Sequence, residues 1–258
     1  MNKTTAKENN NPNTPQKEKI KGVFSTQVLM KIGTGTTQRK TIQKSYWFAQ
    51  ELDDGTIEIQ PLNVNYVPSG PKKQISKEDF LDKFSPEPEF YVQTVYPKMR
   101  ELTKTIARAE RHRQRGETYS AEFEYKNALK IDEENIRANF GLGLTYLERG
   151  DKEKAKDVFE RLVKLDAAFE EEHKHLFNEF GINLRKQKMY DEAVRYYNRA
   201  LELTKDDEHL HYNIARAYFG LNKIDKVVEH LKQALSLNPD FEEAKKFMEY
   251  LKKKGFIK

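Results

Sequence analysis

The second half of the chain repeats one pattern of small and aromatic residues. Four stretches begin with a small or branched residue, continue with an aromatic residue or leucine four positions later, and usually reach alanine three positions beyond. The sets are Ala121, Tyr125 and Ala128; Ala155, Phe159 and Leu162; Ala193, Tyr197 and Ala200; and Val227, Leu231 and Ala234. Their first members are 34, 38 and 34 residues apart. This period predicts helix pairs that stack on their neighbours as a solenoid.

A second small residue lies twelve positions before each set, at Ala109, Gly143, Gly181 and Ala215. A small residue there lets one helix settle into the groove of the other, where a large side chain would push the two apart. Gly116, Gly150 and Asn222 fall where the turns between the paired helices are expected.

On these residues the chain resembles a protein of four tetratricopeptide repeats, which we place over residues 98–240. The expected fold is mostly α: an α-solenoid of four helix pairs with a C-terminal capping helix, preceded by a small antiparallel β-rich region. We expect the capping helix over residues 241–258, where Phe241, Ala244, Met248 and Leu251 share one face. The second interval, of 38 residues, has four extra residues, which predict one added turn in the first helix of the third pair.

The region over residues 20–97 follows a different pattern. Three runs rich in β-branched and aromatic residues predict a sheet of about three strands, with residues 33–40 ("GTGTTQRK") joining the first two as a hairpin tip. This glycine-rich stretch is not a phosphate cradle, because Gln38 stands where a P-loop needs glycine. "SKEDFLDKF" predicts a short helix capped by Ser76. We expect this region to pack against the solenoid.

Two further segments flank this sheet. "SPEPEFYVQTVYP" predicts a stiff connector whose Phe90, Tyr91 and Tyr96 dock on the first repeat. Residues 1–19 contain almost nothing apolar, and we expect a disordered tail there.

Composition argues against catalysis. The chain has no cysteine, and no serine, carboxylate or histidine constellation stands out from a background that is 34% charged. The histidine pairs His173/His175 and His209/His211 cannot each chelate one ion, because residues two apart on a helix point about 200° apart. We therefore expect a non-enzymatic protein without cofactor or metal. No stretch of about eighteen apolar residues occurs, so we expect a soluble, cytoplasmic protein.

The resemblance implies that the first helix of each pair lines a concave groove that holds a peptide or helix of a partner protein. By register, the lining residues are Arg137, Phe140, Leu144, His175, Asn178, Ile182, Arg185, His209, Tyr212, Asn213 and Arg216. Apolar residues beside arginines and amides suit a peptide with acidic groups. The family's clamp for an acidic chain terminus is not supported, because Ile106, Gly141 and Glu179 occupy three of its positions.

Two alternatives stay open. The groove could be filled by the N-terminal region or be simply solvated. The protein could also contact RNA or DNA, because Lys17, Lys31, Arg39, Lys40, Lys44 and further lysines surround the aromatic residues Tyr46, Trp47 and Phe48. In the plainer interpretation these three aromatic residues form the core of a small sheet.

Overall fold

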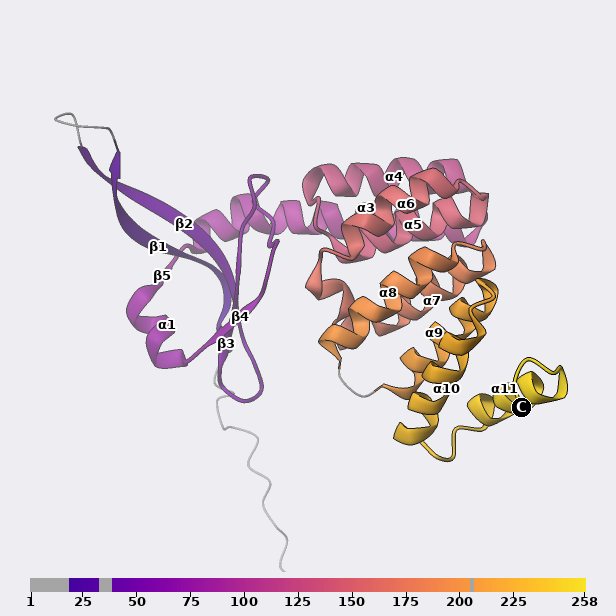
Figure 1. The fold of residues 1–258 in the computed structure, drawn as a ribbon. Coiled ribbons are helices and arrows are strands. Elements are labelled where there is room, and N and C mark those ends of the chain that lie inside the picture. Colours follow the sequence, from indigo (N-terminus) through magenta and orange to yellow (C-terminus); the bar gives the residue numbers. More distant parts are fainter. Residues whose placement is uncertain (1–18, 33–38, 205–206) are drawn as a thin grey trace, which may run out of the picture. The chain divides into compact units, whose positions relative to one another are not determined.

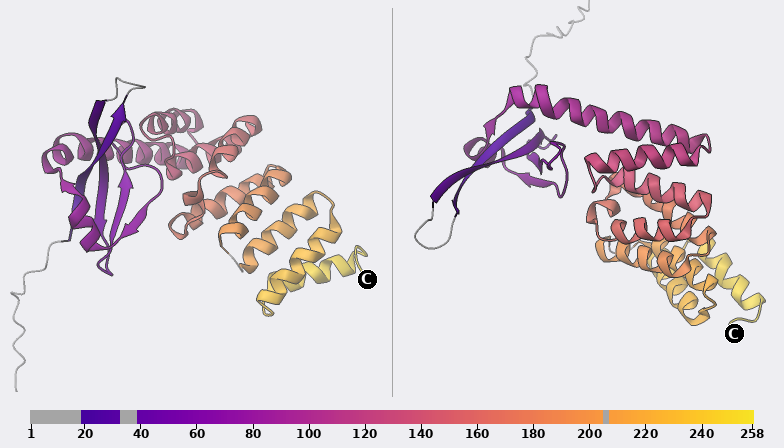
Figure 2. Two further views of the ribbon diagram at one scale, coloured as in Figure 1. Left: turned by 60° about the vertical axis from the view of Figure 1, so that its left-hand side comes forward. Right: turned by 90° about the horizontal axis from the view of Figure 1, so that it is seen from above.

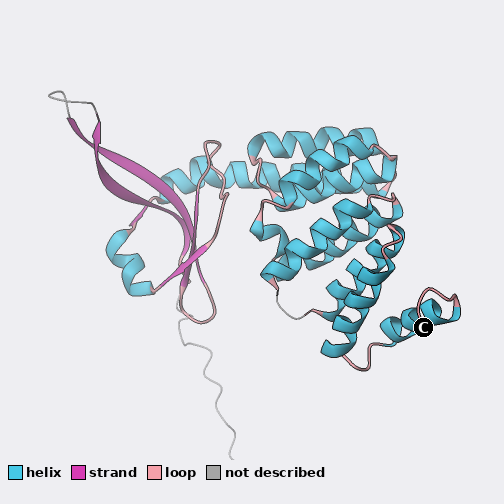
Figure 3. Ribbon diagram, viewed as in Figure 1, coloured by secondary structure: helices cyan, strands magenta, loops and turns pink. Residues whose placement is uncertain are grey.

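The computed structural model describes residues 19–32, 39–204 and 207–258, which fall into two compact units. The first unit comprises residues up to 62 together with 72–93, and the second comprises 63–71 together with 94–258. Figures 1 and 3 show the strands in the first unit and the long helices in the second. The tail expected over 1–19, apart from Lys19, and positions 33–38 of the expected hairpin tip lie outside the described residues.

The first unit is built on an antiparallel sheet with the strand order β4-β3-β2-β1-β5. Its strands are β1 (Lys21–Ile32), β2 (Arg39–Glu51), β3 (Ile57–Pro61), β4 (Lys73–Ile75) and β5 (Ser85–Pro86). The three predicted strands are confirmed, and the Ile32–Arg39 pairing makes β1 and β2 a hairpin. The two edge strands were not predicted, since runs of three and two residues are too short to show alternation.

Aromatic and branched side chains from the sheet and from helix α1 (Lys77–Lys83) form the core of this unit. Phe80 of α1 is fully buried, and its ring centre lies 4.7 Å from that of Phe24. The predicted cap is confirmed, because Ser76 Oγ accepts a hydrogen bond from the Asp79 amide at 3.1 Å. Trp47 packs against this core, as the plainer interpretation held.

The predicted stiff connector is largely helical. α2 (Pro88–Phe90) continues as a π-helical turn, η2 (Tyr91–Val95), that runs into the long helix α3 (Tyr96–Gln114). Phe90 and Tyr91, which we expected to dock on the first repeat, pack against Tyr46 and Phe48 of β2, with ring centres 4.5 and 6.2 Å apart. That part of the prediction was wrong. The aromatic residues indicate that the segment packs against another part of the protein, but the sequence does not show which part.

The second unit is a stack of antiparallel helix pairs (Figures 1 and 2). The pairs are α3 (Tyr96–Gln114) with α4 (Thr118–Ile131), α5 (Ile136–Arg149) with α6 (Lys152–Leu162), α7 (Lys174–Lys186) with α8 (Tyr190–Leu203), and α9 (Glu208–Gly220) with α10 (Ile224–Leu237). A final helix, α11 (Glu242–Lys253), follows them as predicted and buries Ala244 and Leu251. The four pairs and the capping helix confirm the predicted solenoid.

The predicted close approach of helices at small residues is confirmed. A Cβ atom added at Gly143 would lie 2.6 Å from the Phe180 ring, and one at Gly181 would lie 2.4 Å from Tyr197 Oη. Gly116 and Gly150 adopt positive φ in the turns between helices, and Asn222 does the same in the fourth pair. These turns need the left-handed conformation that glycine and asparagine tolerate best.

The four extra residues of the second interval do not lengthen a helix. They form two 3₁₀ turns, η3 (Asp166–Phe169) and η4 (Glu171–His173), ahead of α7, which has 13 residues against 14 in α5. Phe169 is 7% exposed, with its ring centre 5.7 Å from that of Phe177 and 5.5 Å from that of Tyr196. This aromatic cluster anchors the turns and explains why the insertion folds inward.

Residues 63–71, which leave the sheet after β3, pack with the helices although they lie within the expected N-terminal region. Asn63 Nδ2 donates to the Ile131 carbonyl at 2.9 Å, and Asn65 Nδ2 donates to the Lys130 and Ile131 carbonyls at 3.0 Å. Val67 is fully buried in the helical core. The segment therefore satisfies carbonyls at the end of α4 that have no partner within the helix.

Candidate partner-binding groove

In the first two repeats, two of the residues that were predicted to line the groove are buried. Phe140 and Leu144 on α5 have no exposed surface, so they cannot contact a partner. The register prediction was wrong for both, because α5 is enclosed by α3, α4, α6 and α7 and buries every residue from Ala138 to Leu147. Arg137 is exposed, but its Nη2 donates to Glu110 Oε1 at 2.7 Å.

The first helices of three successive repeats are tied together by one ion network. Arg113 of α3 donates through Nη1 to Glu148 of α5 at 2.6 Å and to Glu179 of α7 at 3.0 Å. Partial burial acts to lower the pKa of Arg113, but the two carboxylates outweigh it and raise the value. The two carboxylates neutralise the Arg113 guanidinium, although its Nε is buried without a hydrogen-bond partner.

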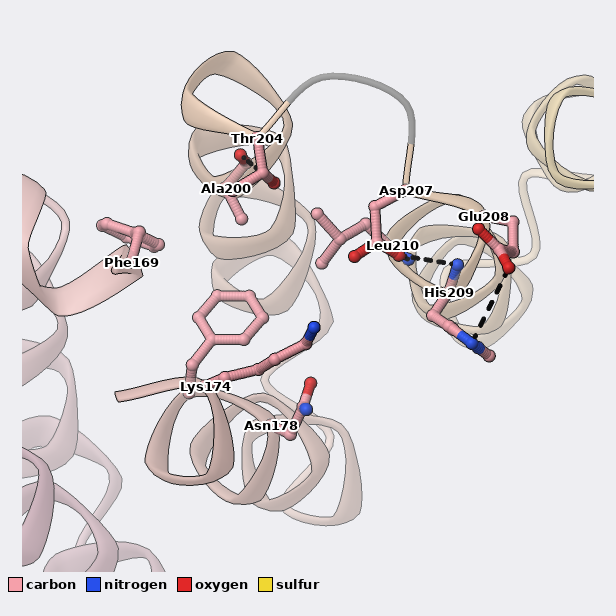
Figure 4. A pocket seen from close by; sticks show the side chains of 10 residues that line it. Phe169, Lys174, Asn178, Ala200, Thr204, Asp207, Glu208, His209 and Leu210 are labelled. Atoms are coloured by element: carbon pink, nitrogen blue, oxygen red, sulfur yellow. Dashed lines mark hydrogen bonds and ion pairs between the residues drawn. The ribbon is translucent and has the colours of Figure 1, made fainter. Parts of the chain in front are cut away.

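Two other predicted residues, Asn178 and His209, line a hollow of about 390 Å³ between α7, α8 and α9 (Figure 4). Phe169, Phe177 and Leu210 give it an apolar side. The polar groups have local roles: Asp207 Oδ1 accepts from the amides of His209 and Leu210 at 2.8 and 3.1 Å, which caps α9. His175, in the first turn of α7, is exposed and does not line this hollow.

A larger hollow of about 620 Å³ brings together the other predicted residues of α7 and α9, apart from Asn213, which is half-buried. We call it the basic groove. Its lining residues are Ile182, Arg185 and Lys186 of α7; Tyr190 of α8; Tyr212, Arg216, Phe219 and Gly220 of α9; and Glu243, Lys246 and Phe247 of α11. Four of these residues were predicted: Ile182, Arg185, Tyr212 and Arg216.

The charges of the basic groove are unbalanced. Arg185, Lys186, Arg216 and Lys246 line it with one carboxylate, Glu243. Within the part of the chain that the structure describes, none of these four cations has a carboxylate oxygen within 4.0 Å. Arg185 Nε is buried and has no hydrogen-bond partner. Four cations without a carboxylate partner therefore lie together around one hollow.

Aromatic rings from three helices form the apolar part of the groove. The ring centre of Phe247 lies 5.4 Å from that of Phe219 and 6.3 Å from that of Tyr212. The Arg216 guanidinium lies 5.6 Å from the centre of the Tyr212 ring. Gly220 makes room for Tyr190, because a Cβ atom there would lie 2.4 Å from that ring. The groove can thus bury apolar side chains while its cations meet carboxylates.

Sequence reasoning missed the contribution of α11 and of the second helix of the third pair. Lys246 and Phe247 were expected only to cap the stack, and Tyr190 opens a second helix, which the resemblance places outside the groove. One available signal was the spacing of Tyr212, Arg216 and Phe219 at i, i+4 and i+7, which puts all three on one face of α9.

The aromatic residues proposed to stack bases in the β-rich region are engaged in packing. Trp47 Nε1 donates to Thr26 Oγ1 at 3.2 Å, and the Trp47 ring centre lies 6.1 Å from that of Phe84. Lys44 forms an ion pair with Glu87. The described residues of the sheet therefore give the nucleic-acid alternative little support.

Two models of the tetratricopeptide repeat match the chain, one over residues 136–169 and the other over residues 184–249. The first range covers the α5/α6 pair, and the second runs from the end of α7 into α11. The helical unit is therefore built of tetratricopeptide repeats, as the sequence pattern indicated.

Curated proteins similar to this chain include the mitochondrial import receptor subunit TOM70 of Saccharomyces cerevisiae, 41% identical over 61 residues, and the TPR repeat-containing protein MJ1428 of Methanocaldococcus jannaschii, 27% identical over 141 residues. The matches cover 24% and 52% of this chain. The chain spans only 10% and 24% of the length of these relatives, so their activities are not carried over.

Solved structures similar to the chain include MamA of Desulfovibrio magneticus RS-1, with a TM-score of 0.42 and 21% identity over 55% of this chain and 78% of that one. Another is PilF of Pseudomonas aeruginosa, with a TM-score of 0.43 and 20% identity over 57% of this chain and 66% of that one.

No helix among residues 19–32, 39–204 and 207–258 is long and apolar enough to cross a membrane. Within the same ranges, no three His, Asp or Glu side chains gather as a metal site would require.

Proposed function

We propose that the protein is a non-enzymatic adaptor that holds a segment of a partner protein in the basic groove. The observation that carries this proposal is the set of four unmatched cations beside aromatic rings around a 620 Å³ hollow. A segment with carboxylates next to apolar side chains would match both properties. The matches to tetratricopeptide repeats support a role in binding other proteins. The cytoplasmic location expected from the sequence stays a prediction.

The structure guides the choice of test residues. Tyr212 packs against Phe241, with ring centres 5.2 Å apart, so replacing it by alanine would weaken the fold as well as the groove. Arg216 and Lys246 are exposed and unpaired among the described residues, so reversing their charges should leave the fold intact. We therefore choose Arg216→Glu combined with Lys246→Glu.

The experiment is selection of peptides from a random displayed library on the full chain. We expect the enriched peptides to carry Asp or Glu beside aromatic or aliphatic residues. A synthetic peptide of that sequence should bind the Arg216→Glu/Lys246→Glu variant at least about tenfold more weakly, a loss of about 1.4 kcal/mol. Isothermal titration calorimetry measures both affinities.

The matched control is Lys152→Glu combined with Lys232→Glu, which changes two exposed lysines on α6 and α10 by the same total charge. This control should keep the affinity of the original chain within about twofold. Enriched peptides without acidic residues, or equal weakening in both variants, would contradict the proposal.

A further inference from the structure

The first helix of the first repeat, α3, carries a local excess of positive charge. The chain carries 46 basic and 41 acidic residues, a net charge of +5. Residues 96–115, which cover α3 and its C-terminal cap, contain seven basic and two acidic residues and so carry the same net charge, +5. Residues 245–258 reach the same net charge with six basic residues and one acidic residue, so α3 is one of the strongly basic segments of the chain.

Four of these cations form one line on the outer face of α3. Arg100, Lys104, Arg108 and Arg111 are spaced at i, i+4, i+8 and i+11, which places them within about 80° of one another around the helix. All four are exposed. The opposite face, with Leu102, Ile106 and Ala109, is buried in the solenoid. We call this line, about 17 Å long, the α3 stripe.

The stripe is largely unpaired. Arg108 donates through Nε and Nη2 to the Glu124 carboxylate at 3.1 and 3.0 Å. Arg100, Lys104 and Arg111 have no carboxylate oxygen within 4.0 Å among the residues that the structure describes. Like charges four residues apart destabilise a helix, so the fold gains nothing from this arrangement.

A hollow of about 460 Å³ follows the first half of the stripe. Its lining residues are Tyr96, Pro97, Arg100, Glu101, Lys104, Thr105 and Arg108, all of α3. The Tyr96 side chain is half-exposed at the beginning of the line. A ligand here would meet regularly spaced positive charges, with Tyr96 and Pro97 at one end.

We propose that the α3 stripe binds the phosphodiester backbone of a single-stranded nucleic acid. Cations repeating about every 6 Å along a straight line suit a ligand whose charges also recur regularly, and Tyr96 can stack a base at one end. Membrane insertion would need the apolar face of α3, which is buried in the solenoid. An acidic protein segment would use apolar anchors, which this face does not provide.

The proposal moves the nucleic-acid alternative from the sheet to the first repeat, and it is independent of the basic groove.

The experiment measures fluorescence anisotropy of a labelled oligouridylate of about 12 nucleotides, titrated with the full chain. If the four cations each neutralise one phosphate, affinity falls about fiftyfold between about 50 and about 200 mM salt, since each contact contributes about −0.7 to the logarithmic slope for single strands.

Arg100→Gln combined with Lys104→Gln removes two of the four contacts and keeps good helix formers. We expect weaker binding at low salt and a fall of only about sevenfold over the same salt range. The control, Lys152→Gln combined with Lys232→Gln, removes the same charge from other helices and should behave like the original chain. The Arg216→Glu/Lys246→Glu variant of the basic groove should keep the same salt slope.

Three outcomes would overturn the proposal. The first is no binding of the oligouridylate at the lowest salt. The second is an equal loss in the α3 variant and in the lysine control, which would show that net charge alone attracts the probe. The third is that polyglutamate displaces the probe as effectively, per charge, as unlabelled oligouridylate does. The stripe would then be a surface for acidic proteins.

Discussion

At the scale of single residues, Gly141 has the least room for a side chain among the described glycines of the solenoid, although the repeat pattern did not single it out. Gly141 on α5 lies against the buried ring of Tyr125 on α4, so that an added Cβ atom would stand 2.1 Å from Cζ of that ring. Tyr125 has no room to withdraw, because it is 1% exposed within the helical core. The missing side chain at Gly141 therefore sets the distance between these two helices.

Gly141→Ala should lower the free energy of unfolding by about 2 to 3 kcal/mol through overpacking. Urea unfolding followed by circular dichroism measures it. The comparison is Gly150→Ala, where φ is 80° and nothing lies within 4 Å of an added Cβ atom. That change should cost only about 1 kcal/mol, from the left-handed backbone. A larger loss at Gly150 than at Gly141 would contradict this account.

Glu122 on α4 has a carboxylate that is partly buried and held by three donors. Its carboxylate accepts from Lys126 at 2.7 Å and from Tyr146 Oη at 3.0 Å, and Arg149 lies 2.8 Å away. Burial acts to raise the pKa of Glu122, but these donors outweigh it and lower the pKa from 4.5 to about 2. The resulting stability is complete above the unfolded-state pKa and is lost as pH falls toward 2.

Glu122→Gln should lower the free energy of unfolding by on the order of 2 kcal/mol at neutral pH. Near pH 2 the difference between the variant and the original chain should become small, because the original carboxyl is then protonated too. Urea unfolding at both pH values measures this. The control is Glu153→Gln, an exposed first-turn residue of α6, with an expected effect below about 0.5 kcal/mol. An equal effect of Glu122→Gln at both pH values would refute the charge explanation.

At the scale of elements, the sequence predicted the helices and strands that neighbouring residues determine, and it missed those that depend on contacts far along the chain. Helix pairing followed from small residues at fixed spacing, and Gly143 and Gly181 do lie at close contacts. The strands β4 and β5 were too short to show a period, and the turns η3 and η4 depend on Phe169 reaching Tyr196 of a later helix. Features decided by contacts far along the chain could not be seen in advance.

The candidate site shows the same division. Ile182, Arg185, Tyr212 and Arg216 were found by register because α7 and α9 each turn one face toward the groove. Phe140 was misplaced because α5 lies against four other helices, and register does not show how many neighbours a helix has. Phe247 was missed because the position of α11 depends on how the last pair packs.

The capping helix provides a test at this scale. Leu251 of α11 is fully buried in a C-terminal cluster with Ala215, Val227 and Leu231, separate from the main helical core. Leu251→Ala should cost about 2 to 5 kcal/mol. In a solenoid this loss should stay local, so amide hydrogen exchange should quicken in α9, α10 and α11 while α3 and α4 keep their protection.

The control for this change is Lys252→Ala, the exposed neighbour of Leu251, which should leave exchange rates unchanged. Exchange that quickens equally throughout the stack would mean that the helical unit unfolds as one cooperative block.

At the scale of the whole molecule, some charged side chains form ion pairs within the fold, and others have no ion-pair partner among the described residues and can meet a ligand. Across a chain that is 34% charged, most of the described charges near one another form pairs, as in the network of Arg113 with Glu148 and Glu179. Cations without a carboxylate partner occur throughout the helical stack, and at the α3 stripe and the basic groove several of them lie together on one surface. Paired charges stabilise the solenoid modestly, and unmatched ones leave its surface ready for anionic partners.

The course of residues 63–71 has a consequence for how this protein can be divided. These residues follow β3 and precede β4, yet Val67 lies in the helical core. A gene fragment that begins after the sheet would encode repeats without that side chain, and one that ends before α3 would leave it exposed to water. No single cut of the coding sequence yields two intact halves, so recombination can transfer this architecture only as one inseparable block.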